Sequence, residues 1–249
     1  MCRHIAYVGE PVRLADLLLT PANSLLRQSW APCDMRGGGT VNADGFGIGW
    51  YTASSPEPAL LRRAVPMWTD TALPRLAEEV TSGAVLAAVR SATVGMPVVE
   101  TASAPFAWDR WLFSHNGVVR GWPSSVVGLA STLPVEALLT LDAPTDAALL
   151  WALLRHRLAA GDKPADAMAA LVTEVEAAAP GSRLNLLLTD GSVVVGTSWT
   201  HSLWVGEFGS SVVVASEPYD DGPSWREVPD RHLVVATRST VDITPIGDR

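Results

Sequence analysis

The sequence contains few cysteines and no long apolar segment. Its 249 residues include two cysteines, Cys2 and Cys33, which are too few to build a disulfide framework. No apolar run approaches the roughly 18 residues that a membrane-spanning helix needs. The N-terminal segment also lacks a secretory signal, because Arg13 and Asp16 interrupt its apolar stretch. We therefore expect a cytoplasmic protein without a membrane partner.

Basic residues are in the minority as well. Lys and Arg together number 18, against 26 Asp and Glu, which gives a net charge of −8. Because nucleic-acid-binding proteins usually carry a basic surface, we do not expect a nucleic-acid partner. The histidines are not at metal-ligand spacing and no C-x-x-C motif occurs, so we expect no bound metal. Gly45, Gly47 and Gly49 open a strand rather than a helix and thus form no dinucleotide loop, and we expect no cofactor.

The order of the predicted elements indicates an α+β fold. Strands are predicted around residues 4–7 and at 46–51, 85–89, 111–113, 184–188, 193–195, 203–205, 212–215 and 233–236. Helices are predicted at residues 14–19, 70–81, 145–160 and 164–179. This order lacks the regular strand–helix alternation of a doubly wound sheet. We expect one domain, residues 2–249 after removal of Met1, with two sheets and with helices outside them.

Cys2 carries the strongest chemical signal. If Met1 is removed, Cys2 holds both a thiol and a free α-amine, whose pKa of about 7.7–8.0 in peptides suits a base near neutral pH. A thiol beside a base is the smallest activated nucleophile, and here no histidine partner is needed. Position alone fits an ordinary residue of a buried strand equally well, because the reactivity of a thiol depends on its surroundings.

Five further segments follow Cys2 in order, at residues 42–50, 90–95, 114–117, 145–146 and 215–218. Each is a weak signal alone, but the ordered set resembles the class II glutamine amidotransferases. This family is the N-terminal-cysteine branch of the N-terminal nucleophile hydrolases. The resemblance implies an αββα four-layer sandwich of two antiparallel sheets, in agreement with the α+β order of elements.

The resemblance also implies roles for individual residues. Cys2 matches the family's nucleophile, and Asn116 and Gly117 match the pair whose amide N–H groups form the oxyanion hole. Arg90 matches the arginine that binds the substrate's α-carboxylate, and Asp146 matches the carboxylate that binds its α-ammonium. Thr93 matches a residue that lines the same glutamyl pocket.

The same residues, taken singly, have simpler interpretations. Arg90 could form a surface salt bridge, Asp146 could only cap a helix, and Asn116 and Gly117 could form a tight hairpin turn. Residues 42–45 are expected to shape the wall of the site, and Cys33 to be an ordinary loop thiol.

Several stretches, at residues 2–4, 88–97, 103–106, 215–221 and 229–233, resemble a branch of the family that acts in ergothioneine biosynthesis. The resemblance implies an amidohydrolase that releases glutamate from a small γ-glutamyl amide through a thioester on Cys2. The chain is short for a second catalytic domain, which favours a free-standing hydrolase, and a homo-oligomer is possible. Two alternatives remain: a glutaminase subunit that passes ammonia to a separate synthase, and a non-catalytic γ-glutamyl sensor.

The leaving part of the substrate implied by this branch carries a trimethylammonium group. Such a cation would suit a pocket lined by tryptophans, through cation–π attraction. Four of the ten tryptophans are candidates for the wall, although packing in the core or on the domain surface is the commoner role for any single one. The candidates are Trp50, Trp68, Trp108 and Trp111.

Overall fold

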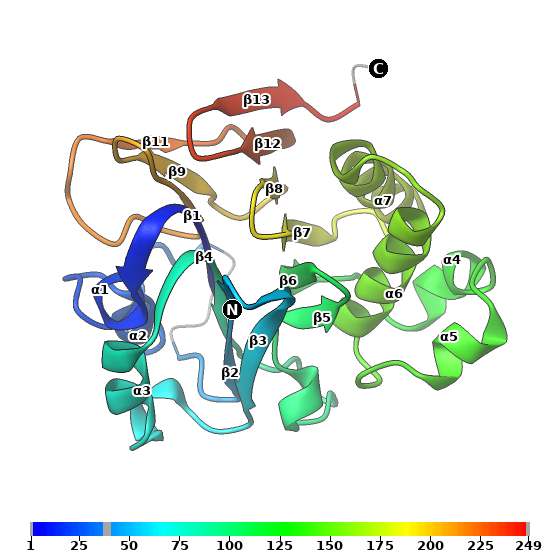
Figure 1. Cartoon of the computed structure of the whole chain (residues 1–249). Helices are drawn as coiled ribbons and strands as arrows, with labels where there is room; N and C mark the ends of the chain where they lie inside the picture. Colours follow the sequence, from blue (N-terminus) through cyan, green and yellow to red (C-terminus); the bar gives the residue numbers. More distant parts are fainter. Residues whose placement is uncertain (1, 37–40, 248–249) are drawn as a thin grey trace.

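A computed structural model describes residues 2–36 and 41–247, in which two antiparallel sheets lie between two groups of helices (Figure 1). The first sheet has the strand order β11-β9-β10-β1-β4-β2-β3, and the second has the order β13-β12-β8-β7-β6-β5. The strands of the first sheet are β1 (Arg3–Arg13), β2 (Phe46–Thr52), β3 (Ser55–Arg63), β4 (Thr81–Val89), β9 (Trp204–Glu207), β10 (Val212–Ala215) and β11 (Trp225–Glu227). Those of the second are β5 (Phe106–Trp108), β6 (Trp111–Val118), β7 (Arg183–Thr189), β8 (Val194–Ser198), β12 (His232–Ala236) and β13 (Val241–Pro245).

The helices fall into two groups on opposite sides of the sheets (Figure 1). The first group comprises α1 (Leu14–Leu18), α2 (Leu25–Gln28) and α3 (Leu73–Glu79). The second comprises α4 (Val127–Ala130), α5 (Val135–Leu139), α6 (Asp146–Ala159) and α7 (Pro164–Ala178). Short 3-10 turns occur at Met67–Thr69, Glu100–Ala102 and Ser124–Val126. Within the described residues, no helix is long and apolar enough to span a membrane.

The alternation of side chains along β1 explains why the sheets stack. Ile5 and Tyr7 pack against the helices α1–α3, whereas Ala6 and Val8 pack against apolar residues of the second sheet. The α6 and α7 helices cover the far face of that second sheet. Both faces of β1 are therefore buried, and the predicted α+β fold with four αββα layers is confirmed.

The two long helices lie where the sequence predicted them. The N-cap of α6 is Thr145, whose Oγ1 accepts a hydrogen bond from the Ala148 N–H at 3.2 Å. The helix predicted at 70–81 is shorter, because Thr81 already belongs to β4. Asp70 still contributes to its start, since one carboxylate oxygen accepts the N–H groups of Ala72 and Leu73.

Candidate active site

Cys2 lies directly before β1, the central strand of the first sheet. The register of β1 and β4 pairs Arg3 with Val89, so that Cys2 comes to lie beside Arg90 and Ser91. The half-buried Cys2 thiol is 3.8 Å from the Ser91 carbonyl oxygen, to which it donates. Strand alternation puts Cys2 on the same face as His4, whose Nδ1 is 3.1 Å from Ser114 Oγ of the second sheet. Cys2 thus faces the space between the two sheets.

A cavity at this point brings together five of the six residues that the sequence singled out. Its lining includes Cys2, Arg90, Thr93, Gly117 and Asp146, which come from distant parts of the chain. Apolar side chains, among them those of Met96 and Phe106, complete the wall. The sixth residue, Asn116, does not line the cavity, although both of its neighbours in β6 do.

The cavity contains two opposite charges that do not neutralise each other. Arg90 donates from Nη1 to the Pro97 carbonyl at 2.9 Å, and Asp146 accepts the N–H groups of Val119 and Ala147. Within the described residues, neither forms an ion pair with another side chain, although Asp146 is 5% exposed and Arg90 9%. Buried charges are normally paired, so this arrangement suits a ligand that carries both a carboxylate and an ammonium group. The simpler interpretation of Arg90 as a partner in a surface salt bridge does not hold, because the residue is buried and forms no ion pair with a described residue.

The segment at residues 42–45 supports the Arg90 side of the cavity. The Asp44 N–H donates to the Arg90 carbonyl at 2.9 Å, and the Arg90 N–H donates to the Gly45 carbonyl at 2.8 Å. The Asp44 carboxylate also accepts the Ala92 N–H at 2.8 Å. Gly45 has a φ of +134°, and a Cβ there would lie 2.2 Å from Ser103 Oγ, so the position requires glycine. Residues 42–45 thus hold the backbone of the wall residues Arg90 and Ala92, although none of the four lines the cavity itself.

Asn116 and Gly117 lie within β6 and form no hairpin turn, because they pair with Asn185 and Leu184 of β7. A Cβ at Gly117 would lie 1.8 Å from the Arg183 carbonyl oxygen, so no larger residue fits between these strands. Asn116 is 1% exposed, and its Nδ2 lies 3.2 Å from Ser216 Oγ.

Comparison with known proteins identifies the family. Residues 20–206 match the family described as glutamine amidotransferases class-II. The chain belongs to this family. It is 40% identical to a γ-glutamyl-hercynylcysteine sulfoxide hydrolase of Mycolicibacterium smegmatis, over 99% of this chain and 100% of the relative. A protein of the same name from Mycobacterium tuberculosis (strain CDC 1551 / Oshkosh) is 38% identical, over 99% of this chain and 97% of the relative.

Solved structures show the same fold. A glutamine aminotransferase class-II domain protein from Silicibacter pomeroyi has a TM-score of 0.71 at 24% identity, over 99% of this chain and 100% of that one. The glutamine phosphoribosylpyrophosphate amidotransferase of B. subtilis has a TM-score of 0.70 at 13% identity, over all of this chain and 50% of that one. At these identities the likeness concerns the fold alone.

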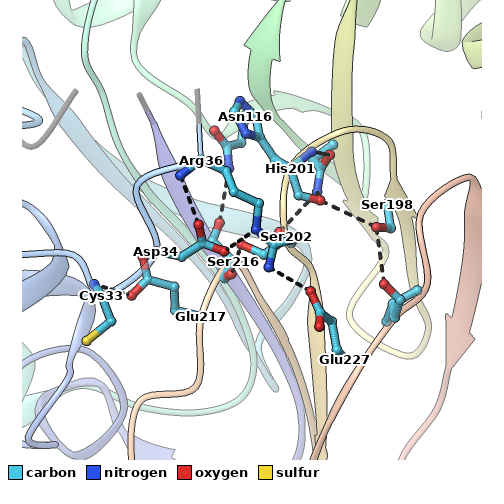
Figure 2. A network of polar contacts seen from close by, with 12 residues as sticks. Cys33, Asp34, Arg36, Asn116, Ser198, His201, Ser202, Ser216, Glu217 and Glu227 are labelled. Atoms are coloured by element: carbon cyan, nitrogen blue, oxygen red, sulfur yellow. Dashed lines mark hydrogen bonds and ion pairs between the residues drawn. The ribbon is translucent and has the colours of Figure 1, made fainter. Parts of the chain in front are cut away.

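Arg3, the residue next to Cys2, forms a buried ion pair with Glu217. The sequence analysis assigned no role to this pair. Arg3 Nε donates to Glu217 at 2.6 Å, with the two side chains 3% and 2% exposed. Arg3 Nη1 donates to the Cys2 carbonyl at 3.0 Å, and Nη2 donates to the Asp34 carbonyl. The other Glu217 oxygen accepts the backbone N–H of Cys33 (Figure 2). Arg3 and Glu217 both lie in segments that carry the family resemblance, and this was the only feature of the sequence that could have drawn attention to them.

Two histidines, His4 and His201, are buried and are neutral at physiological pH. Burial, followed by the charges of His115 and Arg3, lowers the pKa of His4 to about 3. Burial and the nearby Arg183 lower the pKa of His201 to about 3 as well. Neither imidazole therefore supplies a positive charge to this amidotransferase site.

None of the residues that line the cavity beside Cys2 is a tryptophan, so the tryptophan wall expected for the leaving group is not part of this cavity. Trp111 is buried in the core between β6 and the α6–α7 helices, and Trp108 packs against the same core. Trp50 packs towards α1–α3, and the half-exposed Trp68 meets Trp30 edge to face at 5.7 Å. Within residues 2–36 and 41–247, no group of His, Cys, Asp and Glu could hold a metal ion.

Proposed function

We propose that this chain hydrolyses the γ-glutamyl amide of γ-glutamyl-hercynylcysteine sulfoxide to glutamate and hercynylcysteine sulfoxide, as a step of ergothioneine biosynthesis. The names of relatives at 38–40% identity over nearly the whole chain support this substrate. The observation that carries the proposal is the cavity in which the Cys2 thiol shares the wall with the unpaired charges of Arg90 and Asp146.

These charges match the constant part of a γ-glutamyl substrate. The Arg90 guanidinium binds the α-carboxylate, because its planar fork suits two parallel hydrogen bonds to a carboxylate. Asp146 binds the α-ammonium, and Thr93 lines the same cavity. The variable part of the substrate then extends from the γ-amide, which is the bond that Cys2 attacks.

The proposed reaction begins after removal of Met1. The α-amine of Cys2 accepts the thiol proton, directly or through a water molecule, and the thiolate attacks the γ-carbonyl carbon. The N–H groups of Asn116 and Gly117 stabilise the oxyanion that forms. When the C–N bond breaks, the leaving amine takes the proton from the Cys2 ammonium, and a γ-glutamyl thioester remains.

Water then attacks the thioester carbon and gives its proton to the α-amine of Cys2. The C–S bond breaks, the thiolate regains a proton, and glutamate leaves. A single residue thus serves as nucleophile and as base in both halves of the reaction, consistent with the neutral, buried state of His4 and His201.

The test is turnover by the purified chain, with glutamate measured as product. We expect γ-glutamyl-hercynylcysteine sulfoxide to be hydrolysed faster than glutamine, and intact mass to show that Met1 is absent. Cys2→Ala should abolish turnover and still bind the substrate. Cys33→Ala, which removes an exposed thiol, is the matched control and should retain activity. Turnover by Cys2→Ala would refute the assignment of the nucleophile.

The alternatives predict different results in the same assay. A glutaminase subunit would prefer glutamine and depend on an added synthase partner. A γ-glutamyl sensor would bind the substrate without turnover or would retain Met1.

A further inference from the structure

Ser216, the first residue after β10, connects the two sheets behind Cys2. It is 1% exposed, its N–H donates to the His4 carbonyl at 2.9 Å, and its carbonyl accepts the Ser202 hydroxyl at 2.9 Å. Its Oγ accepts the His4 N–H at 3.0 Å. The same Oγ lies 3.2 Å from Asn116 Nδ2 (Figure 2). Ser216 is thus rigidly held and touches the amide assigned above to the oxyanion.

The amide of Asn116 has two orientations, related by a half-turn about χ2. In the structure, Nδ2 faces Ser216 Oγ, and the buried Oδ1 has no hydrogen-bond partner among the described residues. Ser216 Oγ then only accepts, and no described residue accepts its hydroxyl proton. A half-turn lets the Ser216 hydroxyl donate to Oδ1, so that both the hydroxyl and Oδ1 gain a partner, and it frees the N–H groups of Nδ2 for another acceptor.

The fixed neighbour of Ser216 favours the turned orientation. The backbone N–H of His4 can only donate, so it occupies one lone pair of Ser216 Oγ. The Ser216 hydroxyl proton therefore points away from His4 and needs an acceptor of its own. The proposed reaction also requires the turned orientation. An oxyanion needs a hydrogen-bond donor, and the Asn116 Oδ1 atom, if it faced the oxyanion, would repel it. We propose that Ser216 is a positioning residue that donates to Asn116 Oδ1 and so directs the Asn116 amide N–H groups to the oxyanion. This inference rests on the proposed function.

Kinetics of variants separate positioning from a structural role. Ser216→Ala should lower kcat for γ-glutamyl hydrolysis about tenfold, the value of one net hydrogen bond, and leave KM within about twofold. Asn116→Ala should lower kcat about 100- to 1,000-fold, as the loss of an oxyanion donor does. Ser202→Ala, which removes a buried hydroxyl bonded to the Ser216 backbone, is the matched control and should keep kcat within about twofold.

The double variant gives the decisive comparison. If Ser216 acts through the amide, Ser216→Ala should change kcat less than about twofold when Asn116 is already alanine. A structural role would cost the same factor in both backgrounds, and that result would overturn the inference. An active wild type with a slow Asn116→Ala and an unimpaired Ser216→Ala would overturn it too, and would leave the proposed function standing.

A measurement on the wild type keeps the test open if Ser216→Ala does not fold. Neutron diffraction from deuterated protein locates the deuterons directly. We expect one on Ser216 Oγ directed at Asn116 Oδ1, whereas amide deuterons directed at Ser216 would refute the proposal. This result does not depend on turnover, so a failure of the proposed function is distinguishable from a failure of this inference.

Discussion

Glu217→Gln removes the negative charge from the buried ion pair beside Cys2. The pair is formed by Arg3 Nε and Glu217 Oε1 at 2.6 Å, and both side chains are almost completely buried. A glutamine keeps the size and can still accept the Cys33 N–H, so the change isolates the charge. The guanidinium of Arg3 would then be buried with only neutral acceptors, the carbonyls of Cys2 and Asp34.

The expected loss is large because a buried charge without its partner is costly. Breaking such a pair on one side destabilises a protein by about 3–5 kcal/mol. At about 2–4 °C per kcal/mol for a chain of this size, the Tm should fall by about 6–20 °C. Glu227→Gln makes the same chemical change in the pair with Arg36, whose side chains are 43% and 51% exposed. That control should cost less than about 1 kcal/mol.

Urea unfolding and calorimetry of the two variants measure these free energies. Glu217→Gln should also lower kcat, because Arg3 holds the Cys2 carbonyl and thereby the position of the proposed nucleophile. If Glu217→Gln is as stable and as active as Glu227→Gln, the charge of Arg3 is compensated elsewhere, and the reasoning is refuted.

Three further changes test other parts of the site. Asp146→Asn should raise KM for the γ-glutamyl substrate about 10- to 100-fold, as the loss of a charged hydrogen bond does, with steady-state kinetics as the measurement. Gly117→Ala should destabilise the chain by about 1–3 kcal/mol or more in urea unfolding, because its Cβ would lie 1.8 Å from the Arg183 carbonyl oxygen. Acid should destabilise the protein through His4 and His201, whose pKa of about 3 lies below the ordinary 6.5, so that the unfolded chain takes up their protons first. The contribution of the two neutral histidines to the free energy of unfolding is complete above pH 6.5 and is lost as the pH falls towards 3. The loss is about 1.4 kcal/mol per pH unit for each histidine, or about 4 kcal/mol for both between pH 6.5 and 5. A flat stability profile over this range would contradict the burial of these imidazoles.

Local sequence patterns predicted the elements that carry a strong periodicity and missed those that do not. The α6 and α7 helices were predicted within one or two residues, because their apolar stripes and flanking residues are clear. The strand β3 was missed, since Pro56 and Pro58 interrupt its pattern. Prolines are tolerated there because β3 is the last strand of its sheet, and one of its edges has no partner strand among the described residues. The short helices α4 and α5 were missed as well, and they contain no fully buried residue to mark them.

The contacts around Cys2 depend on one strand register that no local pattern reveals. The strands β1 and β10 pair Ile5 with Ala215. Continued towards the N-terminus, this antiparallel register places His4 opposite Ser216 and Arg3 opposite Glu217, and both pairs are in fact bonded. Because side chains alternate along a strand, the side chains of Arg3 and Glu217 lie on one face of the sheet, and those of His4 and Ser216 lie on the other.

Arg3 and Glu217 form their ion pair on the face of α1–α3 and hold the Cys2 backbone there. On the opposite face, Ser216 reaches Asn116 of the second sheet. A slip of one residue between β1 and β10 would exchange the two faces and break both arrangements at once. The backbone of Cys2, the proposed nucleophile, and the amide of Asn116, the proposed oxyanion donor, are therefore positioned by the same pairing, although the two residues are more than one hundred positions apart in the sequence.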